Sequence, residues 1–134
     1  PMNKMIATIT SITTSDSLAF LELDAAGISL GMVLFDLKPE FVVGTRVHLL
    51  FKETEVALGV ALNGGISFCN QFPARIESIR RGKILSFIEL KSPAGPLGSV
   101  ITTRSADRLR LKEGMDVTAI VKASQISMEA CHEY

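Results

Sequence analysis

Three short polar segments in the second half of the chain carry residue types that suit a small anion. They are residues 67–71 (Ser-Phe-Cys-Asn-Gln), residues 102–106 (Thr-Thr-Arg-Ser-Ala) and residues 122–124 (Lys-Ala-Ser). Together they offer hydroxyl donors, backbone N–H groups at the start of a short helix, and one ammonium group. Hydroxyls donate hydrogen bonds with adaptable geometry, and a helix N-terminus favours negative charge. This combination is typical of a site for a small dianion.

Each segment taken alone has a simpler explanation. A serine at a helix start, such as Ser105, is usually a cap, and an isolated Lys122 is more often a solvated charge at a strand end. Catalysis has less support than binding. His48 lies on an alternating strand, and the chain offers neither a Ser, His and Asp set nor a Cys and His set that could be argued as nucleophile and base. We therefore expect a binding protein, not an enzyme.

The elements that must position these segments are repeated along the chain. Residues 7–12 match residues 74–79 at four of six positions, an offset of 67. Residues 18–23 match residues 85–90 at the same offset. Ordered blocks at one offset indicate a duplicated module, and such a repeat decides the fold.

The duplication predicts the domain organisation. We expect a first module at residues 2–62, a linker and start of the binding segment at residues 63–69, and a second module at residues 70–130. The linker contains Asn-Gly-Gly, a flexible turn signal. The second copy is three residues longer than the first, and the extra residues fall between Gly98 and Gly114.

Each copy has the pattern of short strands. Residues 45–51 alternate, with Val47, Leu49 and Phe51 on one face. Five short strands per copy favour a small closed barrel, so the predicted fold class is all-β, with tandem OB-like five-stranded barrels and at most one short helix in each. Residues 102–114 predict that helix in the second copy, led by hydroxyl residues and ended by a glycine.

The charge balance excludes a broad surface for polyanions. The 134 residues include 14 Lys and Arg against 14 Asp and Glu, so the net charge is zero. Residues 1–66 carry −3 (four basic, seven acidic), whereas residues 67–134 carry +3 (ten basic, seven acidic). An OB-type nucleic-acid- or protein-binding module remains the alternative. A basic run at residues 75–83 supports it, and an aromatic content of 6% weakens it.

The order and spacing of the three segments resemble those of the Mop (molbindin) or TOBE family. The pattern is Ser67-x-x-Asn70-Gln71, then Thr102-x-x-Ser105-Ala106, then Lys122-Ala123-Ser124. The chain as a whole is similar to a tandem di-Mop protein. It is also similar to the C-terminal domain of molybdate ABC-transporter ATPase subunits and of molybdate-responsive regulators.

This resemblance implies binding of molybdate or tungstate at interfaces between modules or subunits. Two groups of residues would then hold the oxyanion from opposite sides, with no metal coordinated directly by the protein. The first group is Ser67, Cys69 and Asn70. The second group is Thr102, Ser105, Ala106, Lys122, Ala123 and Ser124.

Two departures from the family pattern stand out. Cys69 occupies the position where the family usually has arginine, so a charge-assisted contact is lost there. The first copy has no Ser-x-x-Asn start and has Lys38 in place of Ser105. Lys52 and Thr54 match Lys122 and Ser124, which leaves half of a possible secondary site in a chiefly structural module.

The implied role is intracellular molybdenum or tungsten homeostasis, storage or regulation of transport. We expect a homo-oligomer, dimer or trimer, with molybdate transporter or regulator proteins as further partners. Direct nucleic-acid binding and membrane insertion are not expected. Two cysteines without CxxC spacing fit a reduced, cytoplasmic protein.

Overall fold

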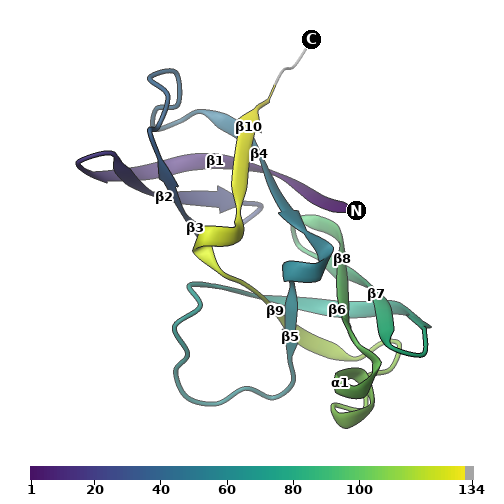
Figure 1. Ribbon diagram of the computed structural model, residues 1–134. Helices are drawn as coiled ribbons and strands as arrows, with labels where there is room; N and C mark the ends of the chain where they lie inside the picture. The colour runs from purple at the N-terminus through teal and green to yellow at the C-terminus, as the bar shows by residue number, and fades with distance from the viewer. Residues whose placement is uncertain (132–134) are drawn as a thin grey trace.

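The computed structural model describes residues 1–131, which form mostly strands (Figure 1). The first-repeat elements are β1 (Met2–Ser15), β2 (Leu18–Ala25), β3 (Ile28–Phe35), β4 (Arg46–Lys52), η1 (Glu53–Glu55) and β5 (Ala57–Gly59). The second-repeat elements are β6 (Asn70–Arg81), β7 (Leu85–Ser92), β8 (Gly95–Thr102), α1 (Thr103–Arg108), β9 (Asp116–Val121), η2 (Ala123–Gln125) and β10 (Ser127–Ala130). Within residues 1–131, no helix has the length and apolar character needed to cross a membrane.

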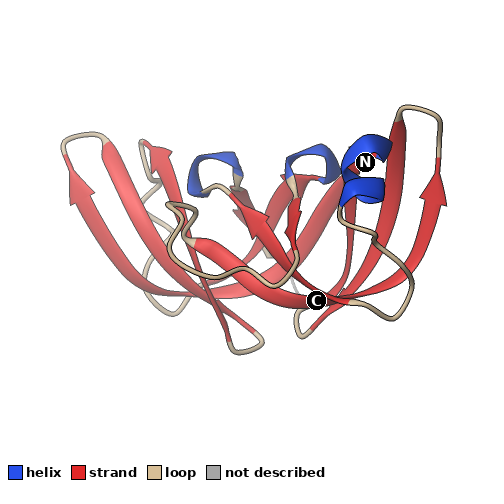
Figure 2. Cartoon of the chain, turned by 90° about the horizontal axis from the view of Figure 1, so that it is seen from below, coloured by secondary structure: helices blue, strands red, loops and turns tan. Residues whose placement is uncertain are grey.

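The strands form two curled antiparallel sheets that lie side by side (Figure 2). The strand order is β10-β4-β1-β2-β3 in one sheet and β5-β9-β6-β7-β8 in the other. β5 belongs to the first repeat but pairs with β9, and β10 belongs to the second repeat but pairs with β4. Each repeat therefore donates its last strand to the sheet of the other. The predicted all-β fold with tandem OB-like modules is confirmed.

The duplication extends to the irregularities of the sheets. The β1–β2 ladder shifts register between Ile9 and Ser11, and the β6–β7 ladder shifts between Ile76 and Ser78, 67 residues later. Such bulges bend a strand and increase its twist. Both sheets can therefore curl at the same point of the repeat.

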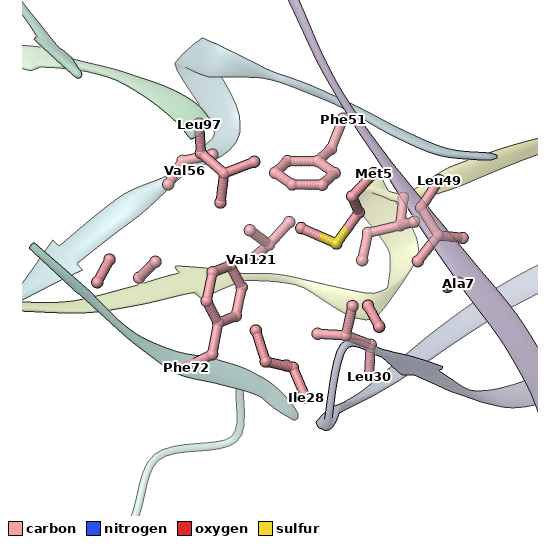
Figure 3. Close-up of a cluster of buried hydrophobic side chains, with 14 of the residues drawn as sticks. Met5, Ala7, Ile28, Leu30, Leu49, Phe51, Val56, Phe72, Leu97 and Val121 are labelled. Carbon is pink, nitrogen blue, oxygen red and sulfur yellow. The ribbon is translucent and has the colours of Figure 1, made fainter. Parts of the chain in front are cut away.

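A single hydrophobic core joins the two repeats (Figure 3). Met5, Leu30 and Phe51 come from the first repeat, and Phe72 and Val121 from the second. Each of the five is at most 3% exposed. Because burial of apolar side chains stabilises a fold, this shared core makes each repeat stabilise the other.

The one α-helix among the described residues is shorter than the sequence pattern predicted. α1 ends at Arg108 instead of continuing towards Gly114. Arg110 adopts a left-handed φ of 54°, Leu111 N–H donates to Ala106 O at 3.1 Å, and Arg110 N–H donates to Asp107 O at 3.0 Å. These two bonds form a Schellman motif, which closes the helix with arginine where glycine is usual.

Candidate functional site

The first predicted segment leads into β6 of the second sheet and is attached to the first repeat by a pair of hydrogen bonds from one asparagine, which we call a clamp. Asn70 is fully buried, and its carboxamide bonds both backbone groups of Gly31 in β3. Gly31 N–H donates to Oδ1 at 2.7 Å, and Nδ2 donates to Gly31 O at 2.8 Å. Both ends of this amide are therefore engaged with the other repeat. In this arrangement Asn70 positions the joint between the repeats.

The same clamp occurs at the start of the first repeat, where sequence reasoning found no counterpart of Asn70. Asn3 donates to Gly98 O at 2.9 Å and accepts from Gly98 N–H at 2.8 Å. Asn3 precedes Asn70 by 67 residues, and Gly31 precedes Gly98 by the same number. The repeat offset therefore contained the signal for a symmetric pair of clamps.

Ser67 and Cys69 lie on the exposed side of the Asn70 clamp. Ser67 is exposed in the loop between β5 and β6, and Cys69 is also exposed. The Cys69 Sγ lies 4.0 Å from Gly31 O. A Cβ added to Gly31 would lie 3.2 Å from this sulfur and 2.8 Å from Cζ of Phe20. The bare backbone of Gly31 therefore lets the thiol and the phenyl ring approach β3 closely.

The Lys122–Ser124 segment lies beside Cys69 and Asn70. Val121 pairs with Asn70 at the end of the β9–β6 ladder, so Lys122 and Cys69 are the residues just beyond this pair at the ends of the two strands. Lys122 and Ser124 are exposed, and Ala123 is half-buried. η2, which begins at Ala123, packs against β3 of the first repeat. The first and third predicted segments therefore meet at the joint between the repeats.

The predicted hydroxyl segment lies beside the matching turn of the first repeat. η1 follows Lys52 and packs against β8, the strand that ends at Thr102. The two turns are therefore exchanged between repeats in the same way as the strands that follow them. Within one chain, Thr102 and Ser105 therefore lie near Thr54, whereas Lys122 lies near Cys69.

A surface groove of about 500 Å³ is lined by the first of these two groups and by chain neighbours of the second. Thr54 from the first repeat and Thr102 and Ser105 from the second contribute hydroxyls to its walls. Phe68 and Gln125 also line it. Because Phe68 belongs to the first predicted segment and Gln125 directly follows the third, all three segments border this groove. Figure 2 shows the helical segments on one side of the molecule, which is consistent with this grouping.

At the start of α1, the side-chain hydroxyls are more accessible to a ligand than the backbone N–H groups. Thr102 Oγ1 accepts from Ser105 N–H at 3.1 Å, and Thr103 N–H donates to Ile84 O at 2.8 Å. Ala106 is 0% exposed, so its N–H is enclosed by the surrounding protein. The hydroxyl of Ser105 is therefore a better placed donor for a ligand in the groove than the N–H of Ala106.

The groove lacks the positive charge that a bound dianion requires. Glu55 lines it, and no Lys or Arg does so within residues 1–131. A buried or half-buried dianion without a compensating cation is strongly disfavoured. Within a single chain, this groove therefore has the donors of an oxyanion site without its counter-charge.

The basic run of the second repeat is engaged with neighbouring side chains. Arg75 Nε lies 3.2 Å from Asp116 Oδ1, and Arg81 pairs with Asp107. The guanidinium of Arg80 lies 4.9 Å from the centre of the Phe87 ring. Three of the four basic residues of this run therefore have partners within the protein.

Comparison with known proteins decides the relationship of the second repeat. Residues 66–128 match the TOBE domain. This match spans 63 of the 134 residues and covers most of the second repeat. The TOBE relationship expected from the three polar segments is confirmed.

Solved structures extend the likeness to the whole chain. The fold is similar to that of the cytoplasmic molybdate-binding protein ModG, in a crystal form with molybdate bound. The TM-score is 0.88, the sequence identity is 20%, and the match covers 96% of each chain. No curated protein is similar enough in sequence to count as a relative. The two repeats of the chain therefore share their tandem architecture with ModG.

Proposed function

We propose that the protein binds molybdate or tungstate at an interface between copies of the chain. The observation that carries this proposal is the groove that gathers Thr54, Thr102 and Ser105 from both repeats. Two likenesses support it: the TOBE domain at residues 66–128, and the fold shared with a molybdate-binding protein. The groove supplies hydroxyl donors for the oxyanion.

The missing counter-charge motivates the location between copies. Lys52 and Lys122 are exposed at the starts of η1 and η2, outside the walls of the groove. A second chain that covers the groove brings ammonium groups to it and excludes water, which strengthens their attraction for the anion. Ser67, Cys69 and Ala123–Ser124 then form the edge that meets the neighbouring chain, while Asn70 and Ala106 shape the site from within.

The biological role that follows is non-catalytic. Oxyanion held between copies stabilises the oligomer, because a ligand that binds the assembled state shifts the equilibrium towards it. We place the protein in the cytoplasm, as a store or as a component that senses molybdenum or tungsten for transport. A molybdate transporter or regulator is the partner of that second role.

The residue assignment is tested by calorimetric titration of molybdate and tungstate into matched variants. Ser105→Ala and Lys122→Ala should each weaken binding at least about tenfold, since a hydrogen bond to a charged ligand contributes about 1.5–3 kcal/mol. Thr13→Ala and Lys112→Ala remove an exposed hydroxyl and an exposed ammonium outside the groove, and should leave affinity unchanged. Equal affinity in all four variants would show that the anion binds elsewhere.

A further inference from the structure

Outside the groove, the side chains of a cysteine, a histidine and a glutamate lie next to one another in space, in that order. Cys131 Sγ lies 3.8 Å from His48 Nε2. On the other side of the ring, His48 Nδ1 lies 4.0 Å from Glu129 Oε1. Glu129 is directly opposite His48 in the β10–β4 ladder, and its Oε1 also pairs with Lys4 Nζ at 3.2 Å. The exchange of β10 into the first sheet creates this cluster, because His48 and Cys131 come from different repeats.

The order of the three groups is that of a nucleophile, a base and a group that orients the base. A carboxylate near Nδ1 favours the imidazole tautomer that carries its proton there. Nε2 is then the acceptor that faces the thiol. Lys4 on β1 and Arg46 on β4 are two further charged residues, and both line a groove of about 530 Å³ that His48 also lines. Cys131 is itself half-buried, so its sulfur is partly accessible to a small reagent.

We propose that Cys131 is a reactive thiol that undergoes exchange with low-molecular-weight disulfides, with His48 as its base. The Cys131 sulfur attacks one sulfur of the reagent while its proton passes to His48 Nε2. A new S–S bond forms as the reagent's S–S bond breaks, and the departing thiolate takes the proton from the imidazolium. Cys131 is oxidised to a mixed disulfide, and one half of the reagent is reduced to a thiol.

The chain contains its own comparison thiol. Cys69 is more exposed than Cys131, and its Sγ contacts Gly31 O at 4.0 Å. A carbonyl oxygen cannot take up the proton of the attacking thiol, so Cys69 reports the rate without a neighbouring base. If exposure alone decided the rate, Cys69 would react faster. The proposal predicts the opposite order.

The test is site-resolved labelling of the full chain at pH 7 with oxidised glutathione, read by mass spectrometry of the two cysteine peptides. Cys131 should react about tenfold or more faster than Cys69, because general-base assistance typically contributes about 10²–10⁴-fold. His48→Gln should lower the Cys131 rate to that of Cys69 without changing Cys69, and Glu129→Gln should lower it less. Iodoacetamide, a neutral reagent, should give the same ranking if the base rather than charge attraction is responsible.

The proposal is overturned if wild-type Cys131 reacts no faster than Cys69 with both reagents. It is also overturned if His48→Gln, with an unchanged circular dichroism spectrum, keeps the wild-type Cys131 rate. Should that variant fail to fold, the wild-type comparison and Glu129→Gln decide the question. None of these measurements depends on oxyanion binding.

Discussion

The two buried asparagines, Asn3 and Asn70, connect the repeats through identical pairs of backbone hydrogen bonds. Asn70→Ala leaves the N–H and C=O of Gly31 unpaired in a buried position, at a cost of about 2–4 kcal/mol in the free energy of unfolding. Asn3→Ala should cost less, because its bonds are only partly buried. Urea denaturation measures both. Asn63→Ala in the exposed loop is the control, and equal stability of Asn70→Ala and this control would contradict the clamp.

The glycines that receive these clamps differ in what surrounds them. A Cβ at Gly31 would lie 2.8 Å from the Phe20 ring, whereas a Cβ at Gly98 would meet the end of the Glu53 side chain. Glu53 can swing away, but the ring has less freedom. Gly31→Ala should therefore destabilise the protein by about 1–3 kcal/mol, and Gly98→Ala by clearly less. Thermal denaturation tests this order, and recovery in Gly31→Ala with Phe20→Leu would identify the ring as the cause.

At the residue scale, the sequence predicted the chemistry better than the geometry. The hydroxyls of Thr102 and Ser105 lie in one groove, as their spacing suggested. The clamp role of Asn70 was not predicted, because a family pattern names the residue types without saying whether a polar side chain faces a ligand or the neighbouring backbone. Asn3 could have been identified as the counterpart of Asn70, because the two residues are separated by the repeat offset of 67.

Among the elements, α1 shows where a local rule misleads. The glycine at 114 suggested the end of the helix, but the chain turns at Arg110, with φ 54°. Arg110→Gly removes the strain of a left-handed L-residue and should raise the free energy of unfolding by about 0.5–1 kcal/mol. Arg108→Gly, inside the helix, should lower it by about 1 kcal/mol. Opposite signs in chemical denaturation would confirm the Schellman end, and a destabilising Arg110→Gly would contradict it.

The strand pattern was predictable because alternation depends on one buried face. Val47, Leu49 and Phe51 in β4 are all buried, as the alternation indicated. The exchange of β5 and β10 was not predictable. β5 has only three residues, and β10 has four, of which three are exposed. Neither strand therefore carries a pattern that specifies which sheet it joins.

At the scale of the molecule, strand exchange and the shared core predict a single unfolding transition. Neither repeat can complete its sheet or bury its apolar face alone. Scanning calorimetry should give equal calorimetric and van't Hoff enthalpies, and residues 2–62 or 70–130 expressed separately should remain unfolded. Two resolved transitions, or a folded fragment, would show that the repeats are independent domains.

The two halves of the chain carry opposite net charges, which bear on where an anion can bind. The first repeat region carries −3 and the second +3, yet the hydroxyl groove between them has an acidic residue and no basic one in its walls within residues 1–131. In the function proposed above, a single chain holds an incomplete oxyanion site. Completion of that proposed site by a second copy connects ligand binding to assembly, which a site within the monomer does not do.

The most direct test is to measure bound molybdenum and oligomeric state in one experiment. Size-exclusion chromatography after incubation with molybdate, followed by elemental analysis of each fraction, gives metal content per chain and molecular mass together. We predict that molybdenum elutes with the oligomer, that added molybdate increases the oligomer fraction, and that excess sulfate does not displace it. Molybdenum absent from every protein fraction, or bound equally by monomer and oligomer, would contradict the central claim.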